Sequence, residues 1–122
     1  MPAYRRAERV ASEIFRVVAE ACYSKLSDAR LHGLQLTRAT VTDDLQIVKL
    51  YYFLEGTEEQ KKRCLDGLNS AKGLLRSVIA SNLSLRIVPE IQFFYDKGME
   101  SSERIYELID SLKTDDPEEK DE

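Results

Sequence analysis

The amino-acid sequence predicts an α+β fold built as one domain, and three observations carry that prediction. Apolar residues recur at helical spacing in separate segments near the start, the middle and the end of the chain. The stretch between residues 34 and 54 is instead rich in Thr, Val and aromatic residues, which favour strands. The length of 122 residues and a hydrophobic content of 43% suit a single core rather than two.

The first predicted element is a helix from Tyr4 to Leu26, without Gly or Pro inside it. Its apolar positions, three and four residues apart, are Ala7, Val10, Ile14, Val17, Val18, Ala21 and Leu26. Arg5, Arg6 and Arg9 crowd its first turns, where the helix dipole disfavours positive charge. An anionic partner would explain this placement, and a solvated helix face is an equal alternative.

A β-hairpin is predicted next, with strands over residues 34–41 and 45–54 joined by the turn Thr42–Asp44. The second strand is apolar on both faces, which indicates a central position in the sheet. Val48, Leu50, Tyr52 and Leu54 form one face, and Ile47, Tyr51 and Phe53 form the other. Tyr51 and Phe53 could stack on bases, but a packed sheet explains them equally well.

The next segment predicts two consecutive helices with an interruption between them. The first begins at Glu58 with Thr57 as its N-cap, and the second runs on to Leu83. Between them lies the run Asn69–Gly73. A Gly inside a continuous helix costs about 1 kcal/mol relative to Ala. The run therefore indicates a kink or a close approach of another backbone.

The last predicted elements are a strand and a short helix. The strand covers residues 85–95, and Pro89 places it at a sheet edge or at a bulge because Pro cannot donate a ladder hydrogen bond. A short amphipathic helix follows, with apolar residues at Ile105, Leu108, Ile109 and Leu112. We expect one domain over residues 1–113 and a disordered acidic tail over residues 114–122.

The predicted order α-β-β-α-kink-α-β, with the helices on one sheet face, matches a type II KH-like domain. KH domains hold single-stranded nucleic acid with a GXXG loop between paired helices. This chain lacks that loop, because Ser70 stands where a GXXG motif ending at Gly73 requires Gly. The usual backbone clamp is therefore absent.

Several motifs resemble the bacterial ribosome-binding factor A family over residues 4–112. The most specific is Asn-Ser-Ala-Lys-Gly followed by an Arg, seen as Asn69–Gly73 and Arg76. The Arg-rich first helix spans Arg5–Arg16. The hairpin and last-strand motifs are Asp44, Leu45, Leu50, Tyr51, Leu85, Arg86, Pro89, Glu90, Ile91, Phe93 and Asp96. Departures from the family pattern, such as Ala29, Thr42–Asp43 and Gly98, fall in predicted loops.

The resemblance implies a KH-like domain in which an Ala-x-Gly kink replaces GXXG. It implies a cytoplasmic protein that binds the small (30S) ribosomal subunit and its 16S rRNA, and we expect the protein to be a monomer. It implies a role in late maturation and 5′-end processing of 16S rRNA, including adaptation to cold, without chemistry or a cofactor of its own. The RNA-binding residues we expect are Arg5, Arg6, Arg9, Ala71, Lys72, Gly73, Arg76 and Arg86. Lys72 and Arg76 are one helical turn apart, so both can reach the same phosphates. Alternatively, these cations are solvated, Gly73 only relieves crowding, and Arg86 pairs with a neighbouring acid.

The charge distribution agrees with an RNA partner better than the net charge of −4 suggests. Residues 114–122 carry six acids and one Lys, whereas the rest carries 17 basic and 16 acidic side chains. Within residues 60–97 the balance is +4, a modest basic patch. A protein-interaction module that docks through the sheet face or the last helix is the main alternative. A general single-stranded RNA binder is a third reading, which the missing GXXG disfavours.

Enzyme, metal and membrane functions find no support in the sequence. His32 is the only histidine and has no catalytic constellation around it, so a surface position is the better interpretation. Asp43–Asp44 is more simply a turn than a metal pair. Cys22 and Cys64 lack zinc-type spacing and are expected to be buried free thiols. No apolar stretch approaches the roughly 20 residues needed to span a bilayer.

Overall fold

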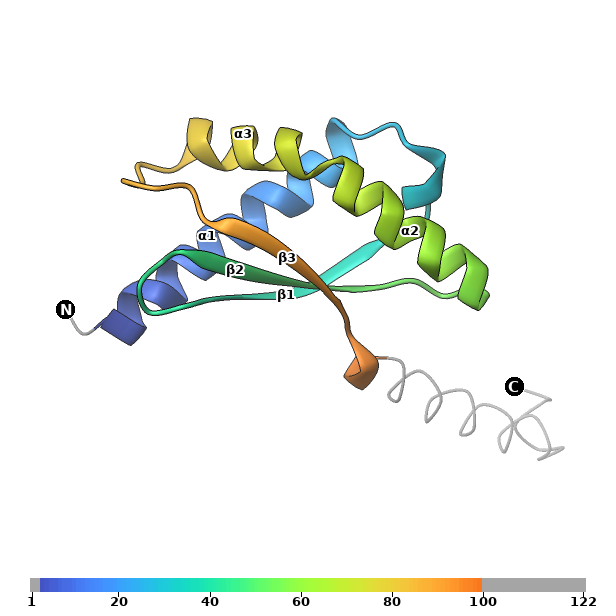
Figure 1. Cartoon of the computed structure of the whole chain (residues 1–122), viewed down its shortest axis with the longest axis horizontal. Coiled ribbons are helices and arrows are strands. Elements are labelled where there is room, and N and C mark those ends of the chain that lie inside the picture. The colour runs from blue at the N-terminus through green and yellow to red at the C-terminus, as the bar shows by residue number, and fades with distance from the viewer. Residues whose placement is uncertain (1–2, 100–122) are drawn as a thin grey trace, which may run out of the picture.

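The computed structural model describes residues 3–99, in the order α-β-β-α-α-β that the sequence predicts (Figure 1). The elements are α1 (Ala3–Ser24), the 3-10 helix η1 (Ala29–Leu31), β1 (Gln35–Val41), β2 (Ile47–Phe53), α2 (Glu58–Ser70), α3 (Lys72–Asn82) and β3 (Glu90–Tyr95). The sequence analysis did not predict the short 3-10 helix η1. The expected helix over residues 105–112 and the tail over residues 114–122 lie outside the described residues.

The sheet has the strand order β1-β2-β3, with β1 antiparallel and β3 parallel to β2. The prediction that the second strand is central is therefore confirmed. Val48, Leu50 and Tyr52 are buried beneath the helices, whereas the alternate residues of β2 point to the opposite face. Figure 1 shows that the helices cover one side of the sheet only.

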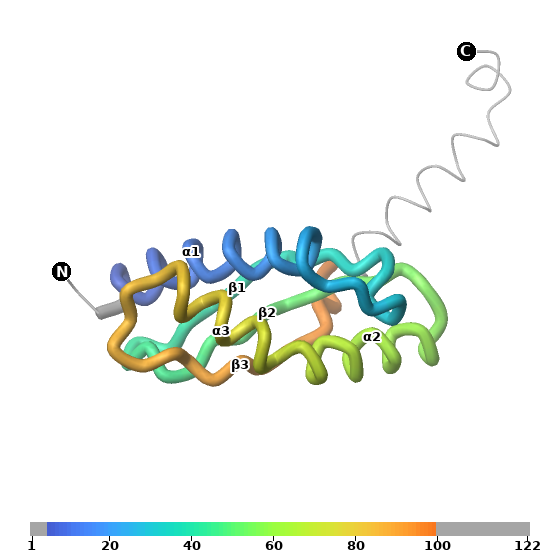
Figure 2. Tube along the Cα trace, turned by 90° about the horizontal axis from the view of Figure 1, so that it is seen from above, coloured from blue at the N-terminus to red at the C-terminus, as the bar shows by residue number. Residues whose placement is uncertain are grey.

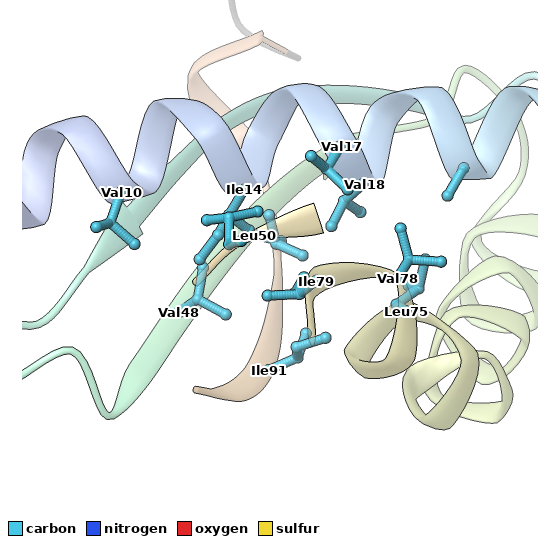
Figure 3. Close-up of a cluster of buried hydrophobic side chains, with 12 residues drawn as sticks. Val10, Ile14, Val17, Val18, Val48, Leu50, Leu75, Val78, Ile79 and Ile91 are labelled. Carbon is cyan, nitrogen blue, oxygen red and sulfur yellow. The ribbon is translucent and has the colours of Figure 1, made fainter. Parts of the chain in front are cut away.

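The core has two clusters, one on each side of the α2–α3 break. The larger cluster joins α1, β2 and α3 through side chains such as Ile14, Leu50, Leu75 and Ile79, all of them 0% exposed (Figure 3). The smaller lies beneath α2 and comprises Leu31, Tyr52, Leu54, Cys64 and Leu68. α2 thus covers the smaller cluster and α3 the larger one. The change of direction between the two helices lets each of them pack on its own cluster.

Three predicted boundaries differ from the structure by two residues or more. The last strand begins at Glu90 and not at residue 85, because Pro89 has no N–H and the ladder starts where the Glu90 N–H donates to Gln46 O at 2.8 Å. Residues 85–88 form a loop in which Arg86 is exposed. The second strand begins at Ile47 because the turn extends through Leu45, which has a φ of 60°. The first helix ends two residues early, at Ser24.

Two local predictions are confirmed. The Thr57 side chain accepts from the Gln60 N–H, and the Gln60 side chain accepts from the Thr57 N–H, so α2 begins with a complete capping box. β3 is an edge strand, and Pro89 lies directly before its first ladder bond. No helix within residues 3–99 is long and apolar enough to cross a membrane.

Both cysteines are free thiols, as expected, but only Cys64 is fully buried, and Cys22 is half-buried. Burial raises the pKa of each thiol to about 11. At neutral pH almost no thiolate is present, and the thiolate is the reactive form. We therefore expect both side chains to react slowly with alkylating reagents.

We predict that the free energy of unfolding falls as the pH rises from about 9 to about 11. In this window the thiols ionise in the unfolded chain, whose thiol pKa is near 9.0, but stay protonated in the folded chain. Urea denaturation at several pH values checks this. Cys64→Ala should remove part of the slope. An unchanged slope in that variant would contradict the assignment.

Candidate RNA interface

The break between α2 and α3 consists of a single residue, Ala71, with φ −88° and ψ −3°. Its N–H is shared between Gly67 O and Leu68 O, each at 3.1 Å, and its carbonyl accepts from the Leu75 N–H at 2.9 Å. One residue thus closes α2 and opens α3. The sequence predicted an interruption within Asn69–Gly73, and the structure places it at Ala71.

The first turn of α3 presents open backbone. No side chain caps this helix, so its first N–H groups lack the partner that a capping oxygen would supply. Gly73 is exposed, and a Cβ at this position would meet no atom within 4 Å. Its φ lies outside the left-handed region, so the break does not require glycine. The absence of a side chain instead leaves space beside a helix N-terminus, where the dipole favours a phosphate.

Lys72 and Arg76 lie on the same flank of α3, toward β3. The Lys72 Nζ is 5.9 Å from the ring centroid of Phe93, and Arg76 Nη2 donates to Val88 O at 3.2 Å. Neither side chain forms an ion pair within residues 3–99. Two cations therefore border the open helix end, and no described carboxylate neutralises them.

Sequence reasoning missed Lys61 of α2, which belongs to the same region. Its Nζ lies 5.0 Å from the ring centroid of Tyr95 and 3.5 Å from Glu58 Oε1. Each of the two inward-facing aromatics of β3, Phe93 and Tyr95, thus lies against a lysine from a different helix. The alternation of Phe93 and Tyr95 was the available sequence signal for this arrangement. The parallel pairing of β3 with β2, which brings both rings beneath the helices, could not be read from a local sequence pattern. We name Lys61, Ala71, Lys72, Gly73 and Arg76 together the kink surface.

The remaining predicted site residues lie outside the kink surface. Arg86 is exposed in the loop before β3, two residues from the Val88 carbonyl that Arg76 contacts, and pairs with no described acid. Arg5, Arg6 and Arg9 are exposed on the first turns of α1. Both views place those turns at the end of the molecule marked N, away from the α2–α3 junction (Figures 1 and 2). Figure 2 also shows α1 and α2 along opposite long sides of the molecule.

The aromatic residues on the second strand are less accessible for base stacking than the sequence analysis left open. Phe53 is only 6% exposed, so the packed-sheet interpretation holds for it. Tyr51 is half-buried, and the Arg38 Cζ lies 3.9 Å from its ring centroid. His32 is exposed, as expected. Asp44 accepts hydrogen bonds from Thr42 Oγ1 and the Gln46 N–H, as a turn residue does. Across residues 3–99, no cluster of His, Cys, Asp and Glu could hold a metal ion.

Comparison with known sequences gives a consistent picture. The sequence profile of the family described as "Ribosome-binding factor A" matches residues 6–109. Proteins with that name are similar to this chain in Syntrophobacter fumaroxidans, at 37% identity over 89% of this chain and 95% of the relative. The same name belongs to a relative in Finegoldia magna, at 38% identity over 88% of this chain and 91% of the relative.

Several solved structures share the fold of this chain. The solution structure of a Thermotoga maritima protein, titled a putative ribosome binding factor A, is 34% identical, with a TM-score of 0.67 over 80% of this chain and 92% of that one. The Thermus thermophilus ribosome-binding factor A crystal structure is 22% identical, with a TM-score of 0.65 over 73% of this chain and 93% of that one. A homology model of the Thermus thermophilus ribosome binding factor A, fitted into a cryo-EM map of its 30S complex, is also 22% identical, with a TM-score of 0.61 over 75% of this chain and 96% of that one. The fold is thus KH-like, as the element order predicts.

Proposed function

Because this chain belongs to the ribosome-binding factor A family, we propose that it binds the small ribosomal subunit through 16S rRNA, with the kink surface as its central contact. A 30S complex of the Thermus thermophilus relative supports the choice of subunit. We further propose that residues 1–113 form the binding domain, that residues 114–122 form a separate acidic tail, and that the protein acts as a cytoplasmic monomer.

The observation that carries this proposal is the unneutralised positive charge beside an uncapped helix. Residues 3–99 hold fifteen basic and twelve acidic side chains, a net of +3, so the basic character is modest. A modest charge binds a preformed RNA surface through a few phosphate contacts, while the assembled subunit supplies the specificity through its shape. Gly73 and Ala71 allow a phosphate to approach the backbone, and Lys72 and Arg76 supply the neutralising charge.

The biological role we propose is assistance in late maturation of the small subunit, including 5′-end processing of 16S rRNA and growth in the cold. The protein would act by binding and not by chemistry. A factor of this kind stabilises one conformation of the RNA by its differential affinity for that conformation. Processing enzymes would then meet the 16S precursor in a form that they can cleave.

The proposal predicts that the protein co-sediments with purified small subunits in preference to large subunits or free rRNA. Binding should weaken steeply with salt, because phosphate contacts release counterions. The measurement is sedimentation through a sucrose cushion at several salt concentrations. Equal sedimentation with both subunits would contradict it, and binding that salt leaves unchanged would favour apolar docking on a protein.

A second prediction separates stability from binding at one position. Gly73→Ala should stabilise the fold by about 0.5–1 kcal/mol, because Gly73 is an exposed helix residue with open space around it. The added methyl should nevertheless weaken subunit binding, because it occupies the space that the phosphate needs. Thermal denaturation and subunit affinity check the two effects. Gly98→Ala, outside the kink surface, is the control for binding. Unchanged affinity in Gly73→Ala would remove the backbone contact from the proposal.

A further inference from the structure

The face of the sheet opposite the helices carries an aromatic and cationic patch. It consists of Arg38 on β1, Lys49 and Tyr51 on β2, and Phe94 on β3, which we name the open-face patch. In the strand register, Tyr51 stands between Arg38 and Phe94. The rings of Tyr51 and Phe94 are 5.7 Å apart, the Lys49 Nζ is 5.8 Å from the Phe94 ring centroid, and Phe94 is 40% exposed. A large apolar side chain that stays exposed beside a second aromatic ring on a sheet face is typical of a surface that another element covers.

The chain itself leaves β3 on this face. Asp96 points to the same side as Phe94, since residues two apart in a strand share a face. One Asp96 oxygen accepts from Thr37 Oγ1 on β1 at 2.5 Å, and the other accepts from the Met99 N–H at 3.1 Å. The carboxylate therefore ties the first turn after β3 to the far edge strand. Figure 1 shows this turn on the side of the sheet away from α2 and α3.

The sequence beyond residue 99 complements the patch in character and length. Ile105, Leu108, Ile109 and Leu112 have the spacing of an amphipathic helix face. Residues 100–122 hold three basic and ten acidic side chains, a net charge of −7, which is opposite in sign to the cations Arg38 and Lys49. Glu90 and Asp96 are acids at the two ends of β3 on this face. As a helix, residues 102–113 would span about 18 Å, close to the roughly 20 Å between Phe53 and Ile47 along β2.

We propose that residues 100–113 dock on the open-face patch, with the apolar stripe against Tyr51 and Phe94 and the acidic side chains beside Arg38 and Lys49. The tether makes this an intramolecular contact with an effective concentration in the millimolar range, so a small apolar area suffices. Both faces of the sheet are then covered, one by the helices and the other by residues 100–113. The kink surface lies on the helix side and stays open to RNA.

A tryptophan at position 94 tests the contact in the full chain, because the sequence contains no other Trp. Emission and acrylamide quenching are compared in Phe94→Trp alone, with Leu108→Glu added, and with Ser111→Glu added. The first addition places a charge on the apolar stripe, and the second places the same charge off it. Loss of an apolar contact of this size lowers the docking equilibrium about tenfold. We expect Leu108→Glu to raise the quenching constant about twofold and to shift emission to the red, with Ser111→Glu unchanged.

Equal quenching in all three proteins would overturn the proposal, with circular dichroism as the check that each is folded. Amide chemical shifts of Lys49 and Tyr51 give a readout without tryptophan, and they should move in the single variant Leu108→Glu but not in Ser111→Glu. Addition of oligouridine tests the alternative that the open-face patch binds RNA by base stacking. If oligouridine quenches the tryptophan equally with and without Leu108→Glu, the patch binds RNA and the segment does not cover it.

Discussion

Replacing both Lys72 and Arg76 with Ala is expected to weaken binding to the small subunit about 100-fold. Each charge-assisted phosphate contact contributes about 1.5 kcal/mol or more, and 1.4 kcal/mol is roughly tenfold in affinity. The log-log salt slope should fall in magnitude by about two, since each phosphate contact accounts for about 0.9. Neither side chain is buried or ion-paired, so we expect each substitution to change stability by no more than about 0.5 kcal/mol.

The matched control removes the same two charges from elsewhere on the molecule. Arg16 and Lys25 are exposed on and just after α1, so Arg16→Ala with Lys25→Ala changes the net charge equally. This control should keep most of the parent's affinity. If the Lys72 and Arg76 double variant binds like the parent at every salt concentration, the kink is only structural. The RNA surface would then have to be sought along Arg5, Arg6 and Arg9.

Leu75→Ala is expected to destabilise the fold by about 2–5 kcal/mol, which is a large part of the stability of a domain of this size. Leu75 is 0% exposed and packs between α1 and β2, and its N–H donates to Ala71 O at 2.9 Å at the start of α3. The cavity therefore forms directly beneath the kink surface. The midpoint of thermal denaturation should fall by on the order of 10 °C or more.

Leu74→Ala is the control for this prediction, because it is the same substitution one position earlier on the same helix. Leu74 is 44% exposed, so its truncation should cost far less than that of Leu75. Thermal and urea denaturation of both variants measure the difference. Equal losses would mean that α3 does not present the face to the core that the structure assigns to it.

Much of the fold could be predicted because local pattern and tertiary packing agree. Val48, Leu50 and Tyr52 alternate with Ile47 and Tyr51, and this two-sided apolar pattern correctly placed the strand at the centre of the sheet. Thr57, predicted as the N-cap, correctly marked the start of α2. The start of the last strand was wrong, because the apolar residues before Pro89 continue the pattern although the ladder cannot begin there.

The candidate site was predictable only where its members are close in sequence. Lys72 and Arg76 share a helix flank, so their spacing sufficed to bring them together. Lys61 joins them through β3, where Phe93 and Tyr95 contact cations from two helices. That arrangement depends on the parallel register of β2 and β3, which no local pattern specifies. Gly73 was expected to shape the kink, but the turn is made by Ala71, and the glycine leaves the backbone uncovered.

The most direct test of the kink surface is a cross-link from position 70, at its border, to rRNA on the small subunit. Ser70 is exposed and lies directly before Ala71, so a probe there does not replace Gly73. Ser70→Cys carries a thiol-reactive photo-cross-linker, and the parent serves as background because the pKa of both native thiols is raised to about 11. Arg9→Cys places the same probe on α1. We predict that position 70 cross-links to 16S rRNA far more than position 9 or the parent. Cross-links to 16S rRNA from position 9 alone would contradict the account.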